Sequence, residues 1–333
     1  MKRIFVHGIG CISPAGWGVA AMTEALDRGV PLAAPPLQRP GSRRPLPFRS
    51  VPAPTVKFPF LAHPRLRRAS SLTVYAAAAA VEAMAALKPS PERRLGIIFC
   101  VTGGCVQFTR RFYHEAWRET TASPVVFPET VFNAPSSHLS ALFSSSAINY
   151  TYVGDPATVV QGLGTAAEWL EDNLVDACLV IGAEENDWLT ADAYRHFSRD
   201  TICSEGAGAI LLSAEPAPIE LAAITDAELY LSAAERAQAL AEVSAHFPAS
   251  ATTLLCDSQT GAAARDRQEK AAWADWPGPR LSPKKILGEG LCAGAAWQCV
   301  AAIQALSRIP SAIAHVAGIH EHAIAAQFLR AQT

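Results

Sequence analysis

Three short stretches of the chain carry reactive side chains where an apolar run gives way to a turn or a helix. The first is NYTYVGDPATVVQGL, residues 149–163, in which Asp155 stands directly before Pro156. The second is CDS at residues 256–258, and the third is EGLC at residues 289–292. A nucleophile at a helix N-terminus is chemistry suited to acyl transfer, because the helix dipole stabilises the ionised form.

A structural role is the preferred interpretation of each of these side chains. Asp155 is expected to cap the helix that follows, and Pro156 suits a first helical turn. Cys256 and Cys292 have no adjacent histidine or lysine in sequence, which favours buried, inert thiols. Reaction through a side chain stays open as the alternative for Asp155, Cys256, Asp257 and Ser258.

Other polar clusters also favour structural roles. His315, His320 and His322 are predicted to be solvated histidines in a turn, since only Glu321 accompanies them. Ser144–Ser146 are predicted to form a polar turn, because no Gly-x-Ser-x-Gly motif surrounds them. HGIGCISPAG lacks the third glycine of a dinucleotide fingerprint. We therefore predict neither a metal site nor a cofactor.

The elements that would position these residues follow an α/β pattern. The strand-like runs RLGIIFCVTG, NYTYV, DACLVIGAEE and GAILLSAE alternate with helix-like segments, among them SSLTVYAAAAAVEAMAAL and residues 157–174. Continuously apolar strands indicate a parallel sheet covered on both faces. The later part repeats the pattern with TTLLCDS and KKILGE as strands, AARDRQEKAAWADW and GAAWQCVAAIQALSR as helices, and AIAHVAGI and HAIAAQFLR at the end.

This repetition predicts two similar halves, residues 1–215 and 216–333. Residues 31–59 are rich in Pro, Arg and Ser without periodicity, and are expected to form a long surface loop. The basic runs RPGSRRPLPFRS and HPRLRRASS are predicted to be solvated loops.

Composition narrows the class of protein. The 333 residues are 50% hydrophobic with a net charge of −2, which argues against charge-driven binding to nucleic acid or membranes. Eight cysteines without CxxC spacing indicate a reducing compartment. No apolar stretch is long enough to span a bilayer, so a cytoplasmic protein is expected.

Six motifs carry a resemblance to a known family. They are HGIGCISPAGWGV, NAPSSHLSALFSSSAINYT, DACLVIGAEE, SEGAGAILLSAE, ARDRQE and GLCAGAAWQ, in this order along the chain. In sequence and order they are similar to motifs of the β-ketoacyl-acyl carrier protein synthases, and they cover most of the chain. The resemblance implies a thiolase-like α/β fold with two similar βαβαβ-type halves in an α/β/α/β/α arrangement.

The same resemblance implies that the catalytic groups are missing. In that family a cysteine at a helix N-terminus attacks an acyl thioester, and two histidines stabilise the enolate formed later. Matching the motifs places Pro156 at the cysteine position, Ser258 at the first histidine position and Leu291 at the second. No cysteine lies between Cys105 and Cys178, so the loss of the thiolate does not depend on the alignment.

Retained motifs without catalytic residues resemble the chain-length factors, the non-condensing partner subunits of polyketide and aryl polyene ketosynthases. The resemblance implies a subunit that pairs with an active ketosynthase and works with an acyl carrier protein in polyketide or fatty-acid-like biosynthesis. Two alternatives stay open. One is an acyltransferase, decarboxylase or condensing enzyme that uses a non-standard residue. The other is a homodimer that binds acyl chains or acyl carrier protein.

The resemblance also assigns roles to individual residues. Glu184 and Glu205 are expected to be structural, and GIHEHA replaces the Gly-Phe-Gly-Gly loop near the end. The residues expected to contact a dimer partner or line an acyl tunnel are Phe127, Phe132, Asn133, Asn149, Tyr150 and Tyr152.

Overall fold

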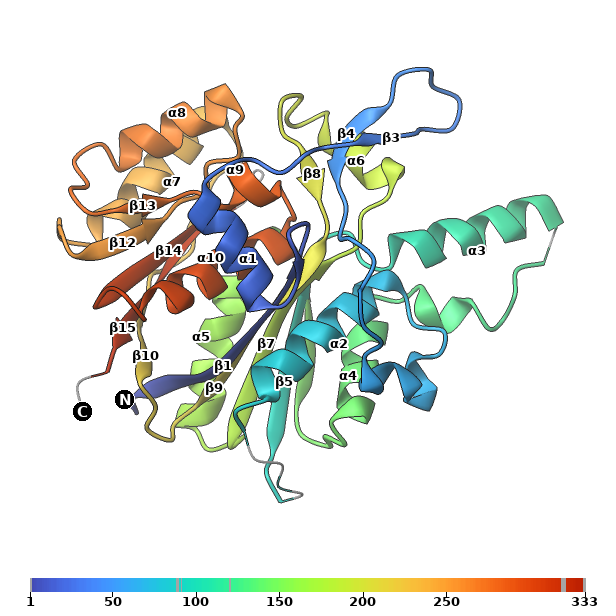
Figure 1. Ribbon diagram of the computed structural model, residues 1–333, viewed down its shortest axis with the longest axis horizontal. Coiled ribbons are helices and arrows are strands. Elements are labelled where there is room, and N and C mark those ends of the chain that lie inside the picture. The colour runs from blue at the N-terminus through green and yellow to red at the C-terminus, as the bar shows by residue number, and fades with distance from the viewer. Residues whose placement is uncertain (1, 88–89, 91, 120, 319–321, 332–333) are drawn as a thin grey trace.

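A broad mixed sheet runs through the computed structural model, which describes residues 2–87, 90, 92–119, 121–318 and 322–331 (Figure 1). Its strand order is β13-β12-β14-β15-β10-β1-β9-β7-β5-β6. The first-half strands are β1 (Ile4–Ser13), β9 (Gly206–Ser213), β7 (Ala177–Glu184), β5 (Leu95–Val101) and β6 (Asn149–Val153). The second-half strands are β10 (Ile219–Ile224), β15 (His322–Arg330), β14 (Ser311–Ala317), β12 (Thr253–Cys256) and β13 (Arg280–Leu281).

The two halves repeat one pairing pattern. From β1 outward to β6 the successive pairs are antiparallel, antiparallel, parallel and parallel. From β10 outward to β13 the sequence of pairings is the same. The halves meet where β1 and β10 pair antiparallel at Ile4 to Val6. This duplication confirms the predicted α/β architecture of two similar halves.

The helices form three layers around the sheet strands (Figure 1). α5 (Thr158–Glu171) and α10 (Cys292–Ala305) contact each other and strands of both halves, so they form the central layer. α2 (Ser71–Met84) and α4 (Ala134–Leu142) cover the outer side of the first half. α7 (Ala233–Ala245) and α8 (Ala263–Ala272) cover the second. This is the expected α/β/α/β/α arrangement.

The remaining elements are short or peripheral. The helices are α1 (Val19–Arg28), α3 (Val106–Glu119), α6 (Trp188–Tyr194), α9 (Pro283–Leu287), η1 (Pro59–Ala62), η2 (Pro64–Leu66) and η3 (Phe127–Glu129). The strands are β2 (Gly16–Trp17), β3 (Pro36–Leu37), β4 (Leu46–Arg49), β8 (Cys203–Ser204) and β11 (Glu228–Leu229). α3 projects away from the body of the molecule in Figure 1. No helix among the described residues combines the length and apolarity needed to cross a bilayer.

Two predictions of local structure are wrong. KKILGE was expected to be a strand, but Pro283 opens the helix α9, since proline suits a first helical turn. The loop at residues 31–59 was expected to lack elements, yet it contains β3 and β4. Phe48 of β4 is buried and pairs with Cys203 of β8, so this part of the segment is packed into the fold. The division into residues 1–215 and 216–333 stays a prediction about domains.

Glycines let β1 and α2 approach closely, and this gives a stability prediction. A Cβ built on Gly10 would lie 1.9 Å from the Ala79 carbonyl oxygen, which is backbone and cannot move aside cheaply. We expect Gly10→Ala to destabilise the protein by about 3 kcal/mol or more. Gly164 is the matched control, because its Cβ would meet only Ile224 at 3.8 Å inside α5. Gly164→Ala should stabilise by about 0.5–1 kcal/mol in urea unfolding, so equal effects would contradict the packing argument.

Candidate functional site

The turn between β6 and α5 carries the position expected of a nucleophile. Pro156 is buried in this turn, and α5 has Ala157 as its N-cap. The Asp155 carboxylate accepts a hydrogen bond from Ala157 N at 3.1 Å, so it stabilises the turn leading into the helix. Sequence reasoning had placed Pro156 in the first helical turn and Asp155 as the helix cap, and both lie slightly earlier. Pro156 offers no nucleophilic atom.

Ser258 follows β12, and its side chain is hydrogen-bonded to backbone groups of the second half. Its hydroxyl donates to the His315 carbonyl at 2.9 Å and accepts from Ala317 N at 2.8 Å and Gln298 Nε2 at 3.1 Å. The Ser258 amide donates to Glu269 Oε1 at 2.9 Å. With its proton and lone pairs engaged, this buried hydroxyl links β12, β14 and α10.

Leu291 stands immediately before α10 in an unusual conformation. Its φ is 51°, a region that most residues avoid, and its amide donates to Glu289 Oε1 at 2.8 Å. The buried side chain belongs to an apolar cluster with Phe48, Tyr194 and Cys203, among others. The second histidine position is thus filled by packed hydrocarbon.

The end of β14 links two of the three positions, Ser258 and the turn that contains Pro156. Ala317 bonds to Ser258, and a Cβ built on the next residue, Gly318, would lie 1.6 Å from Asp155 Oδ1. The end of β14 therefore lies against both the Ser258 position and the turn before α5.

Cys292 is buried beside this site, as the sequence predicted, but its contacts with α5 and with Thr102 after β5 were not foreseen. Its Sγ lies 3.4 Å from Thr102 Oγ1, 3.6 Å from Thr158 Oγ1 and 4.0 Å from the Asp155 carbonyl oxygen. Burial, followed by the nearby Glu184 carboxylate, raises the pKa of the Cys292 thiol well above its ordinary value. The group is therefore a neutral thiol at physiological pH. No sequence spacing indicates its contact with α5.

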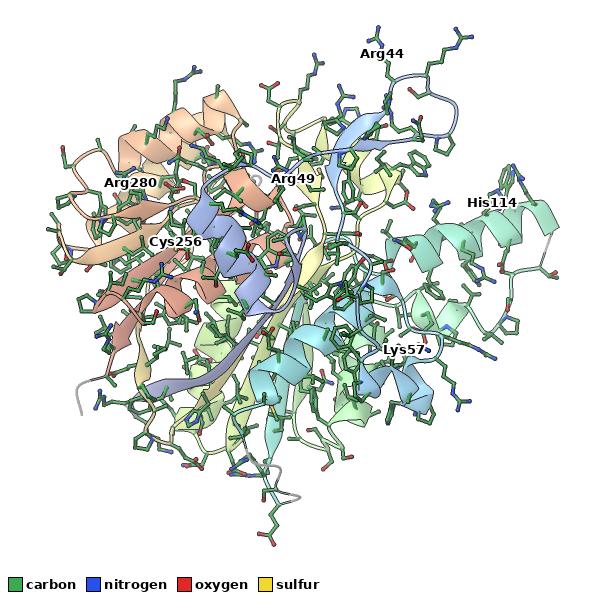
Figure 2. All side chains as sticks on the ribbon, in the orientation of Figure 1. Arg44, Arg49, Lys57, His114, Cys256 and Arg280 are labelled. Atoms are coloured by element: carbon green, nitrogen blue, oxygen red, sulfur yellow. The ribbon has the colours of Figure 1, made fainter. Side chains whose placement is uncertain are left out.

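The other candidate groups for side-chain chemistry are also buried. The Cys256 thiol is fully buried, and burial raises its pKa well above the ordinary value, with Asp257 adding to the effect. In Figure 2 Cys256 lies within the second half of the fold. Asp257 accepts hydrogen bonds from the Gln259 amide at 3.2 Å and Gln259 Nε2 at 2.6 Å. Burial, together with Glu269, raises the pKa of the Asp257 carboxyl.

The predicted histidine turn is wrong at His315. This residue lies in β14 and is completely buried, with Nδ1 2.7 Å from Glu269 Oε1 and 3.3 Å from Trp273 Nε1. His320 and Glu321 lie outside the described residues, and His322 opens β15. Within the described ranges no group of three or more histidine, cysteine or acidic side chains is arranged to hold a metal.

Four of the six residues expected to contact a partner are exposed. Phe127 is 54% exposed, Phe132 44% and Tyr150 51%, and Asn133 is also exposed before α4. The Phe127 ring lies 5.4 Å from that of Phe112 on α3, which ties η3 to that helix. Three of the four exposed side chains are aromatic, with Tyr150 on β6, Phe127 in η3 and Phe132 before α4.

The other two residues are engaged within the chain. Asn149 Nδ2 donates to the Ser136 carbonyl at 2.9 Å and to Ser140 Oγ at 2.6 Å, which anchors β6 to α4. The Tyr152 hydroxyl lies 3.0 Å from Thr165 Oγ1 on α5. Both hold β6 in place.

Glu184 and Glu205 accept hydrogen bonds from backbone amides of nearby loops in the first half. The Glu184 carboxylate accepts from the amides of Thr102 and Gly103, the latter at 3.1 Å. Glu205 accepts from Val51 N at 3.2 Å and, through its other oxygen, from Asn186 N at 3.3 Å. Burial raises the pKa of both carboxyls, that of Glu184 to about 8.

The raised pKa of Glu184 predicts a pH dependence of stability. The folded protein holds this proton more tightly than the unfolded chain, whose carboxyl has a pKa of 4.5. The stabilisation is therefore complete below pH 4.5 and is lost as the pH rises towards about 8. Glu184→Gln keeps an acceptor without a titrating group, so its melting temperature should fall less between about pH 5 and pH 8. Glu24→Gln, at an exposed side chain, is the control and should follow the wild type. Parallel curves for all three proteins would count against this assignment.

No protein-family model matches the chain, and no curated protein matches its sequence. Solved structures nevertheless match it over nearly its whole length. One is a type II polyketide synthase acyl-carrier protein in complex with its ketosynthase, AntDE:AntF, at 18% identity and a TM-score of 0.80, covering 99% of each chain. Another is the ishigamide ketosynthase/chain length factor, at 17% identity and a TM-score of 0.79, covering 99% of this chain and 100% of that one.

A third match is the ketosynthase ApeO in complex with its chain length factor ApeC from Xenorhabdus doucetiae. Identity is 16% and the TM-score 0.74, with 99% of this chain and 98% of that chain covered. At these identities the similarity concerns the path of the chain. It agrees with the duplicated sheet and the paired central helices described above. The chain has the thiolase-like fold found in ketosynthase and chain length factor structures.

Proposed function

We propose that this chain is a non-condensing, ketosynthase-like subunit that pairs with a catalytic ketosynthase. The proposal depends on the residues found at the three positions where the resembled family has its catalytic cysteine and histidines. Pro156 has replaced any nucleophile, the Ser258 hydroxyl is hydrogen-bonded on all sides, and Leu291 is packed in an apolar cluster. A fold retained around such a site is best explained by an assembly role.

An exposed sheet edge supports the pairing. β6 is the end strand of the sheet order, so its outer backbone edge is available for contact with another chain. Val153 on this strand is 52% exposed, close to the value for Tyr150. On the projecting helix α3, Tyr113 and Trp117 are 68% and 89% exposed. Exposed apolar side chains on a sheet edge and on a projecting helix are compatible with contact to another protein.

A basic segment supports an acidic partner such as a carrier protein. Between Asp27 and Glu82 the chain contains no acidic residue, although it carries nine Lys and Arg. Arg44 projects from the molecule in Figure 2, and Lys57, Arg65, Arg67 and Arg68 are exposed in the segment around η1 and η2. Arg49 is buried and Arg39 pairs with Asp192, so the exposed remainder would supply the long-range attraction to a negatively charged protein. Complexes of a ketosynthase with an acyl-carrier protein or a chain length factor occur among the structural matches.

Within the pair, the subunit would set acyl chain length. Phe132 is 44% exposed, and its ring lies 2.6 Å from where a Cβ on Gly104 would stand. The ring is thereby held against the loop before α3, and its exposed face would be available to a partner. A bulky side chain held rigidly at this surface would close an acyl tunnel of the partner by steric contact.

Reconstitution tests the proposal. The purified chain would be mixed with a candidate ketosynthase, an acyl carrier protein and malonyl and acyl thioesters, and products would be followed by mass spectrometry. We expect no condensation by the chain alone, and a stable pair with longer products when the ketosynthase is present. Condensation by the chain alone, or covalent acylation of Asp155, Cys256 or Ser258, would instead favour an enzyme. A stable homodimer that ignores every ketosynthase would favour a binding protein.

A further inference from the structure

The segment that leaves β7 holds the base of the projecting helix α3. β7 ends at Glu184, and residues 185–187, which follow it, are all buried. Three side chains of this segment bind the loop before α3 and the first two turns of the helix. In Figure 1 the rest of α3 extends away from the body of the molecule. The base is therefore where the direction of the helix is set.

Glu185 is the central residue of this segment, because its two carboxylate oxygens serve two helices. Oε1 accepts from Gln107 N in the first turn of α3 at 2.9 Å, and Oε2 accepts from Leu72 N in the first turn of α2 at 3.1 Å. Backbone N–H groups in a first helical turn have no partner within their own helix. One buried side chain thus satisfies an amide of each helix. Because α2 packs on β1 and β9, this bridge joins α3 to the core.

Two more contacts hold the same base. The Glu184 carboxylate accepts from the amides of Thr102 and Gly103, which lie in the loop before α3. One turn into the helix, Arg110 Nε donates to Asp187 Oδ2 at 2.7 Å. The base of α3 is thereby bonded to the segment after β7 at its loop, its first turn and its second turn.

Side chains of the proposed partner surface depend on this base. Tyr113 and Trp117, further along α3, are 68% and 89% exposed. The Phe132 ring lies against the loop before α3, since a Cβ built on Gly104 would stand 2.6 Å from it. Side chains that are held in one orientation before association lose less conformational entropy when they bind.

We infer that Glu185 is a positioning residue, whose bridge between α2 and α3 fixes the direction in which α3 presents Tyr113 and Trp117 to another protein. The effect on recognition rests on the proposed pairing. The anchoring of α3 is a property of the isolated chain and needs no partner.

Hydrogen–deuterium exchange of the isolated full chain tests the anchoring. Burial raises the pKa of Glu185 to about 7, so exchange is followed at about pH 8.5, where the carboxyl is ionised. Glu185→Gln leaves one acceptor oxygen for two amides. α3 is the less buried of the two helices, so its amides should exchange about 10- to 100-fold faster.

Glu82→Gln is the matched control for this variant. Glu82 also accepts from two backbone amides, those of Cys11 at 2.9 Å and Val19 at 2.8 Å. This substitution should speed exchange at the start of α1 and leave α3 unchanged, because Glu82 does not bind the base of α3.

A second variant leaves the buried carboxylate in place. Arg110→Gln breaks the bond to Asp187 at a half-exposed side chain, so the melting temperature should stay nearly unchanged. Exchange in α3 should still rise about 3- to 10-fold. Arg111→Gln is its control, since Arg111 pairs with Glu115 within α3 at 2.7 Å, and it should change exchange by no more than about two-fold.

Affinity for a catalytic ketosynthase, measured by surface plasmon resonance, tests the effect on recognition. Glu185 is completely buried, so it can act on a partner only through the elements that it holds. Glu185→Gln should pair about 10-fold more weakly than the wild type, and Glu82→Gln should pair equally well.

Two results would overturn the inference. One is unchanged exchange in α3 for both Glu185→Gln and Arg110→Gln. The other is faster exchange in Glu185→Gln with unchanged pairing. A wild-type chain that pairs with no ketosynthase would refute the proposed function alone, because exchange in the isolated chain still decides whether Glu185 anchors α3.

Discussion

Val153→Lys is expected to weaken pairing with a catalytic ketosynthase by about 100-fold while leaving the melting temperature nearly unchanged. Val153 is 52% exposed on the edge strand β6, so a lysine there is solvated in the free chain. In a pair formed along this edge the ammonium group would be buried without a partner, at a cost of about 3 kcal/mol. Sedimentation velocity of the mixed proteins, or surface plasmon resonance, measures the change.

The control for this experiment is Val30→Lys. Val30 is 65% exposed in the loop after α1 and lies outside the proposed surface. Both variants add one positive charge, so an electrostatic effect on the whole molecule would appear in each. Equal affinity of the two variants for the ketosynthase would show that β6 does not take part in the interface. The proposal that the subunit does not condense would remain, because it depends on Pro156, Ser258 and Leu291.

Lys284→Met is expected to destabilise the protein by about 3–5 kcal/mol. Lys284 is completely buried, and its Nζ lies 3.1 Å from Glu289 Oε2, whose side chain is 4% exposed. Removing the ammonium leaves a carboxylate enclosed in the protein without a counter-charge. The effect should be measurable as a lower urea midpoint. Glu289 also accepts from Leu291 N at 2.8 Å, so the strained residue before α10 depends on the same group.

A double-mutant cycle distinguishes a lost ion pair from lost packing. Glu289→Gln alone should also be costly, because it leaves the ammonium buried alone. Lys284→Met with Glu289→Gln keeps an acceptor for Leu291 N and removes both charges, so it should be less destabilised than either single variant. If the two single effects simply add, the pair contributes through shape rather than charge.

Local patterns in the sequence predicted much of the fold because their physical causes are local. NYTYV predicts a strand, and β6 spans the same five residues. The alanine-rich run predicts a buried helix, and α2 covers its central part. The prediction of a strand at KKILGE was wrong because an apolar run of this length does not distinguish a short helix from a strand. Pro283, at the start of α9, favours the helix.

Contacts between distant segments could not be predicted in this way. His315 was expected in a solvated turn because of the histidines that follow it, yet β14 carries it into the core against Glu269 and Trp273. The sequence indicated only that Cys292 adjoins Leu291, the second histidine position. Its thiol lies beside Thr158, which is 134 residues away along the chain. Both contacts arise where α10 and β14 pack against other elements, which no periodicity encodes.

The residue order alone indicated two α/β halves and showed that the segment around residue 156, from Cys105 to Cys178, contains no further cysteine. Apolar runs and residue types suffice for both, since burial and nucleophilicity are properties of the residues themselves. The tertiary structure was needed to show that Asp155 and Ser258 both lie against Ala317 and Gly318, and that Cys292 approaches Asp155. It was also needed to show that Lys284 pairs with Glu289 and that β6 ends the sheet order. These contacts depend on how the helices and strands pack, because the distance between segments far apart in sequence is set by the complete fold.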